Sequence, residues 1–294
     1  MTLYLTFEDL KSKKLTINQK IKVSRRAAGQ PPSKLGLRRG SRISVKNAIL
    51  AVIVKSANDA ATVLAEALGN TEVEFAIRMT QKAKDLGMKR TKFRNASGLP
   101  NHRQISTARD MAVLSAALFN TFPEFYHYFS TKQFHWRGRI HRSHNKLLGK
   151  YPGMDGLKTG YIRASGFNIA TSAARNGRRL ITIVLGERSS KSRNNKVRKS
   201  MNVVFQRIEI NKVLAKNKSS KHKNKSTKHA KIRPRSNPKN SNTGLLDRQT
   251  ASNAPAPADG KSWWGIQVGA YKRYASAQHR LRKAAKLLSR ILRH

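Results

Sequence analysis

The chain has 294 residues, of which 38% are hydrophobic, and this length and apolar content allow one sizeable domain with further segments. Sixty-one Lys and Arg stand against 14 Asp and Glu, and the net charge of +47 indicates a polyanionic neighbourhood: nucleic acid, a membrane surface or an acidic cell-wall polymer. The absence of cysteine excludes disulfides and thiolate metal sites, and the longest apolar run, residues 48–54, is too short for a transmembrane segment.

The first part of the chain has helical periodicity. Apolar spacing predicts helical regions over residues 1–10, 44–69, 71–86 and 107–118. The second region is interrupted by a polar stretch at residues 55–59, so two helices with a short break between them are expected. Gly87 is placed as a stop signal, and Thr107 and Asp110 form a capping box.

The pattern changes at Gly166. Residues 166–174 and 179–186 are rich in Ile, Val, Thr and Phe, and the Asn176-Gly177 pair between them predicts a tight hairpin turn. Val197, Met201, Val204 and Ile208 then mark a helix with one apolar stripe. The sequence therefore predicts an α/β (α+β) fold in which helices flank an antiparallel sheet.

A basic stretch separates this domain from the C-terminus. Residues 211–240 contain eleven Lys and Arg and no acid, which is typical of a solvated, self-repelling linker. A short strand at 263–271 and a basic helix at 275–292 follow. Three segments are expected: a domain at 1–210, a linker at 211–261 and a small strand-helix unit at 262–294.

Two tripeptides carry candidate chemistry. Ser56-Ala57-Asn58 lies in the break between helices, and Lys158-Thr159-Gly160 lies just before the hairpin. Each is weak alone, since the first is a common helix cap and the second a common strand edge. In this order and at about this separation, they match the second and third motifs of the penicillin-recognising serine acyl enzymes.

The surrounding residues extend the match. Residues 1–8, 48–61, 95–100, 106–111, 145–147 and 151–186 resemble corresponding blocks of the D-alanyl-D-alanine carboxypeptidases, the low-molecular-mass penicillin-binding proteins of peptidase family S11. This resemblance covers residues 1 to about 210. It implies a β-lactamase/transpeptidase-like domain that removes terminal D-Ala from peptidoglycan pentapeptides through an acyl-serine, without a cofactor.

The resemblance also implies site roles. Ser56 would relay a proton to the leaving group, Asn58 would hold the substrate amide, and Lys158 would attract the substrate's carboxylate. Thr159 would bind that carboxylate, and Gly160 would let the strand approach the substrate. In addition, the Tyr161 N–H would stabilise the oxyanion, and Arg193 matches a carboxylate-clamping arginine.

Other polar residues have plainer expectations. Loop and cap roles are favoured for Asn95, Gly98, Ser106 and Asp110. The histidines of the basic region have no partnering acid, so no metal site is expected; they are His102, His135, His141 and His144.

In the family, the first motif, Ser-x-x-Lys, usually stands immediately before the block that corresponds to residues 1–8. This chain starts at Met1, one residue too late for that motif. Ser143-His-Asn-Lys146 and Ser220-Lys-His-Lys223 fit the pattern but are interpreted as accidents of a lysine-rich sequence. Losing the nucleophile costs about a millionfold in kcat in subtilisin. We therefore expect this polypeptide to have no carboxypeptidase activity.

Partners and location follow from the same resemblance. Peptidoglycan peptide stems, and β-lactams in the intact family, are the expected ligands. Residues 262–294 resemble the start of a SPOR domain, a module that binds glycan strands, at about half its usual length. The family works in the periplasm or cell envelope, although the N-terminus has neither the basic nor the apolar region of a secretion signal.

Three alternatives remain open. The first is a β-lactamase of the same fold, against which the blocks at 95–111 and 151–186 argue. The second is a non-catalytic peptidoglycan-binding or scaffold protein. The third is a nucleic-acid-binding protein, which the charge permits but the pattern argues against, because no aromatic residue lies between Glu209 and Ser262.

Overall fold

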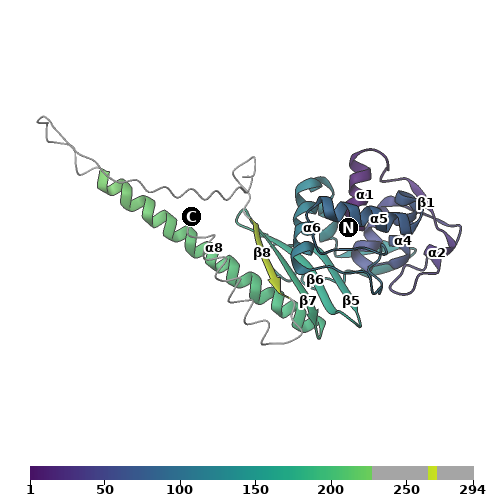
Figure 1. The fold of residues 1–294 in the computed structure, drawn as a ribbon. Coiled ribbons are helices and arrows are strands. Elements are labelled where there is room, and N and C mark those ends of the chain that lie inside the picture. The colour runs from purple at the N-terminus through teal and green to yellow at the C-terminus, as the bar shows by residue number, and fades with distance from the viewer. Residues whose placement is uncertain (227–263, 270–294) are drawn as a thin grey trace, which may run out of the picture. The chain divides into compact units, whose positions relative to one another are not determined.

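A computed structural model describes residues 1–226 and 264–269 of the chain (Figure 1). Contacts divide the chain into two units, one made of Met1–Met201 and Trp263–His294 and the other of Asn202–Ser262. The first unit contains the helices predicted over residues 1–118 and the main sheet. Among the described residues, none of the helices is both long and apolar enough to cross a bilayer.

The helices predicted over residues 1–118 are confirmed. They are α1 (Thr2–Lys11), α3 (Val45–Leu50), α4 (Asn58–Gly69), α5 (Glu72–Asp85) and α6 (Ala108–Thr121). The predicted cap and stop signals are also observed. The Thr107 side chain accepts a hydrogen bond from the Asp110 N–H at the start of α6, and Gly87, just after α5, has φ +76°. Between α3 and α4, the π-helix η1 (Ala51–Lys55) ends at the predicted break.

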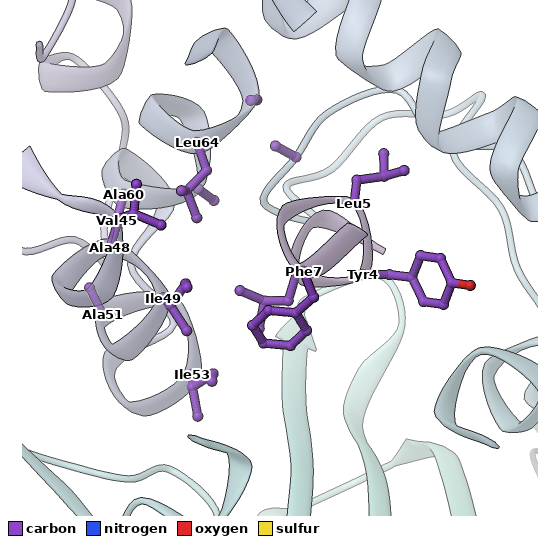
Figure 2. Packing of buried hydrophobic residues seen from close by; sticks show 14 of the residues in the cluster. Tyr4, Leu5, Phe7, Val45, Ala48, Ile49, Ala51, Ile53, Ala60 and Leu64 are labelled. Atoms are coloured by element: carbon purple, nitrogen blue, oxygen red, sulfur yellow. The ribbon is translucent and has the colours of Figure 1, made fainter. Parts of the chain in front are cut away.

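The core forms where α1 meets the helices that follow it. Figure 2 shows Phe7 of α1 on the side of that helix toward Ile49 of α3 and Ile53 of η1, and Leu64 of α4 belongs to the same core cluster. Phe7 is fully buried, and its ring contacts those of Phe122, Phe125, Tyr128 and Phe129 at centroid distances of 5.2 to 6.5 Å. Burial of this aromatic cluster stabilises the position of α1.

The main sheet has the order β5-β6-β7-β8 (Figure 1). Its strands are β5 (Met154–Ile162), β6 (Gly166–Arg175), β7 (Arg178–Glu187) and β8 (Trp264–Gly269). The hairpin is confirmed, with Asn176 and Gly177 at φ +50° and +74°, as a tight primed turn requires. Ala108 and Ala112 of α6 pack on Ile181 and Ile183 of β7, so one face of the sheet is covered by a helix.

β5 forms one edge of this sheet, as expected for the strand that carries Lys158. It pairs antiparallel with β6, while β8 pairs parallel with β7. The predicted strand at 263–271 is thus present as β8, whereas the predicted helix at 275–292 lies outside the described residues.

Several short elements were not predicted. They are β1 (Lys20–Lys22), α2 (Arg25–Ala28), β2 (Arg42–Ser44), α7 (Pro123–Tyr126), η2 (His127–Ser130), β3 (Gln133–Trp136) and β4 (Arg139–Arg142). Elements of three or four residues are too short to develop a periodic pattern, and tertiary contacts decide their conformation.

The last helix is longer than predicted. α8 runs over Ser190–Ser226, so residues 211–226, expected to belong to a linker, are helical. Lysine is a good helix former, and neither glycine nor proline occurs between Ser190 and Pro234, so nothing interrupts the helix.

Candidate active site

Ser56 occupies a strained position at the break between helices. It follows the π-helix η1 and has left-handed backbone angles, φ +56° and ψ +41°. Non-glycine residues rarely adopt this conformation, and π-helical turns often occur at functional sites. The conformation ends one helix and lets α4 begin two residues later, at Asn58.

The loop of residues 31–37 is bonded to this break. The Asn58 Nδ2 donates to the Pro31 carbonyl at 2.9 Å, and the Ser33 Oγ donates to the Lys55 carbonyl at 2.8 Å. The fully buried Asp59 carboxylate accepts hydrogen bonds from three consecutive backbone N–H groups, those of Leu35, Gly36 and Leu37. The loop and the break therefore form one hydrogen-bonded unit.

Lys158 reaches this unit from β5. Its Nζ donates hydrogen bonds to the Ser56 Oγ at 2.7 Å and to the Thr159 carbonyl at 2.8 Å. Burial, and then the charge of Arg193, lower the pKa of Lys158 to about 8. At neutral pH its ammonium group can thus give up a proton far more readily than a free lysine.

Arg193, near the start of α8, is a buried cation, with 3% of its surface exposed. Its guanidinium donates to the side-chain carbonyl of Asn194 and, at 3.3 Å, to the backbone carbonyl of Asn168. Burial lowers its pKa, and no carboxylate within the described part of the chain pairs with it. A buried cation without an acidic partner is suited to bind an anion.

A cavity of about 630 Å³ lies between these elements. All seven predicted site residues line it: Ser56, Asn58, Lys158, Thr159, Gly160, Tyr161 and Arg193. Lys146 and His144 also line it, and none of its described lining residues is Asp or Glu. The site can therefore hold an anionic ligand beside a hydroxyl-ammonium pair.

Some features of the site were missed in the sequence. Asp59 and the loop of residues 31–37 were given no role, although an acid directly after Ser56-Ala57-Asn58 could have suggested a loop anchor. Gly98, expected to serve a loop, has φ +84° and also lines the cavity. Asp110 serves as expected, because its carboxylate accepts hydrogen bonds from the Arg90 N–H and the Thr91 hydroxyl.

Ser143 and the histidines do not form a second reactive centre within the described residues. Ser143 does not line the cavity, and its Oγ accepts the Asn145 N–H at 3.2 Å, so it is not placed as a nucleophile toward a ligand there. In the described residues, the histidines form no cluster of three or more metal-ligating side chains.

Comparison with known proteins gives a consistent family. The sequence model of peptidase S11, described as D-alanyl-D-alanine carboxypeptidase, matches residues 1–189, short of the SPOR-like segment, which no comparison supports. The chain is 32% identical over 228 residues to the D-alanyl-D-alanine carboxypeptidase DacF of Bacillus subtilis, covering 74% of this chain and 57% of DacF.

Solved structures agree on the fold. Penicillin-binding protein 6B of Escherichia coli matches with a TM-score of 0.65 and 36% identity, over 68% of this chain and 66% of that one. Penicillin-binding protein D2 of Listeria monocytogenes, solved with ampicillin bound, matches with a TM-score of 0.62 and 32% identity, over 69% of this chain and 83% of that one. These matches confirm the predicted β-lactamase/transpeptidase-like fold.

The chain spans little more than half the length of DacF, and its match to the family model covers more than half of its own residues. The motifs and the fold lead to the same assignment. The chain belongs to the peptidase S11 family of D-alanyl-D-alanine carboxypeptidases.

Proposed function

We propose that this chain binds peptides ending in D-Ala-D-Ala in the cavity around Lys158, as the site of a serine-type carboxypeptidase of peptidoglycan. One observation carries the proposal: two cations, the half-buried Lys158 and the buried Arg193, face a cavity whose described lining has no acid, beside a hydroxyl within hydrogen-bonding distance of the lysine. A terminal carboxylate would supply the missing negative charge.

Substrate binding would use the edge of β5. The terminal carboxylate would lie between Arg193, Lys158 and the Thr159 hydroxyl, and the Tyr161 N–H would donate to the oxyanion. The Asn58 Nδ2 is engaged by Pro31, so Asn58 would contact the substrate amide through its Oδ1.

Proton transfer would use the Ser56–Lys158 pair. When the tetrahedral adduct of a serine nucleophile with the scissile carbonyl collapses to the acyl-serine and the C–N bond breaks, the Ser56 hydroxyl would donate its proton to the leaving D-Ala nitrogen and recover one from the Lys158 Nζ. The short Nζ–Oγ distance and the pKa of about 8 support this relay, because the lysine is a ready donor near neutral pH.

Gly160 supports a ligand on this edge. A Cβ built there would meet only the Asn168 Cβ, at an ordinary 3.8 Å, and φ at this position is not positive. The protein's own packing therefore does not require glycine here. Close approach by a ligand would require it.

The experiment measures binding of acetyl-Lys(acetyl)-D-Ala-D-Ala to the full chain by calorimetry. We expect saturable binding, no binding of the L-Ala-L-Ala isomer, and at least a tenfold loss of affinity in Gly160→Ala with an unchanged melting temperature. Equal binding of both isomers, or normal binding by Gly160→Ala, would contradict the proposal.

Catalysis is tested separately with a fluorescent penicillin, since β-lactams are proposed ligands of this site. The expectation that this polypeptide has no carboxypeptidase activity predicts that it is not labelled covalently. Labelling that survives denaturation would overturn that expectation. Peptide binding without labelling would favour the non-catalytic peptidoglycan-binding alternative, and rapid penicillin hydrolysis would favour a β-lactamase.

The place of action would be the periplasm or cell envelope, where peptidoglycan lies. Glycan binding by residues 262–294 stays a prediction that rests on the resemblance of the segment 266–271 to a SPOR strand.

A further inference from the structure

The rim of the cavity carries a turn that is firmly attached to β5. Asn145 is buried, with 5% of its surface exposed. Its Nδ2 donates to the Gly156 carbonyl at 3.3 Å, and its Oδ1 accepts the Leu147 N–H at 3.1 Å. The first bond ties residues 143–147, the rim turn, to the strand two residues before Lys158, and the second holds the backbone of the turn itself.

The two residues that flank Asn145 differ from it in their exposure to solvent. His144 and Lys146 are exposed, and both line the cavity. Within the described part of the chain, the Lys146 ammonium has no hydrogen bond or ion pair to another residue. The rim turn therefore holds a free cation at the mouth of the site.

The segment around Lys146 supplies no acid to neutralise this charge. The sequence between Glu124 and Asp155 contains six Lys and Arg and no acid. Partial desolvation of the imidazole, followed by the charges of Lys158 and Lys55, lowers the pKa of His144, so cations of the site act on this histidine. Positive charge at the rim is thus continuous with that inside the site.

The number of cations exceeds what one carboxylate needs. A peptide terminus brings a single negative charge, and Arg193 and Lys158 already face the position proposed for it. A cavity of about 630 Å³ also falls within the range that holds drug-sized ligands, so it has room for more than two alanine residues. A second anionic group on the ligand would use the cation that remains.

We propose that Lys146 is a specificity-determining residue that selects acidic peptides, with a second carboxylate in the residues that precede D-Ala-D-Ala. This inference rests on the proposed function, since it concerns the same ligand. His144 lines the same rim, and Lys146 supplies the charge. The carboxylate would accept hydrogen bonds from the Lys146 ammonium at the mouth of the cavity.

The test compares acetyl-Glu-Glu-D-Ala-D-Ala with acetyl-Gln-Gln-D-Ala-D-Ala on the full chain at physiological salt. We expect the acidic peptide to bind about fivefold more tightly, the upper range for a solvent-accessible ion pair. In Lys146→Gln this preference should fall to about twofold or less, with unchanged affinity for the amide peptide.

Lys150→Gln is the matched control, because Lys150 is exposed in the same basic segment, carries the same charge and does not line the cavity. It should keep the preference. An equal loss of preference in both variants, an equal loss of affinity for both peptides in Lys146→Gln, or no preference in the unchanged chain would overturn the inference while peptide binding stands. Failure of the unchanged chain to bind either peptide would instead overturn the proposed function.

Discussion

The pH dependence of peptide binding should report the charge of Lys158. Its pKa of about 8 lies below the ordinary 10.5, so the ammonium is charged below pH 8 and neutral above it. The peptide carboxylate titrates near pH 3.5 and stays charged throughout. Affinity for acetyl-Lys(acetyl)-D-Ala-D-Ala should therefore fall as the pH rises through 8.

The size of the effect follows from the fraction of protonated lysine. With a pKa of 8, about 90% of the chain carries the charge at pH 7 and about 10% at pH 9. If binding requires the ammonium, affinity falls about tenfold over this interval, which corresponds to about 1.4 kcal/mol. Arg193 keeps its charge throughout, so residual binding should persist at the higher pH.

Calorimetry at half-unit intervals from pH 6.5 to 9.5 would measure this profile. Lys158→Gln should bind more weakly at pH 7 and lose the pH dependence, whereas Lys146→Gln should keep it. A constant affinity across the range in the unchanged chain would refute the assignment of Lys158 to the carboxylate. A fall in affinity with rising pH that persists in Lys158→Gln would also refute this assignment.

Two further variants test the framework of the site. Phe7→Ala removes a fully buried ring that contacts four other aromatic rings, and it should lower the free energy of unfolding by about 3–5 kcal/mol in a urea titration. Val73 is 64% exposed, so the control Val73→Ala should change this free energy by less than about 0.5 kcal/mol. Asp59→Asn replaces an acceptor of three backbone N–H groups and should cost about 1–3 kcal/mol, with faster hydrogen exchange at Gly36; unchanged exchange there would contradict its anchoring role.

The sequence was most informative where a pattern repeats or a motif has fixed chemistry. The helices of residues 44–118 and the hairpin at Asn176-Gly177 follow from periodicity and turn signals, because apolar stripes must be buried and a primed turn needs positive φ. Ser56 and Lys158 were paired by resemblance, and the structure places their side chains 2.7 Å apart.

The remaining features depend on contacts that no local pattern encodes. Asp59 bonds to a loop more than twenty residues earlier, and Asn145 bonds to the backbone of β5. A buried polar side chain of this kind satisfies particular backbone groups, and their identity emerges only once the chain is folded. The extent of α8 was missed for a different reason: charge density suggested a linker, although lysine itself favours helix.

The attachment of the rim turn through Asn145 has a consequence for how such a site can diverge. The side chain that holds the turn is buried, and the two exposed side chains that line the cavity stand on either side of it in sequence. Positions 144 and 146 can therefore exchange charge, size or polarity with little cost to folding, while Ser56, Lys158 and Arg193 stay in place. The proposed peptide preference and the proposed proton relay therefore rest on different elements, so a change in one does not require a change in the other.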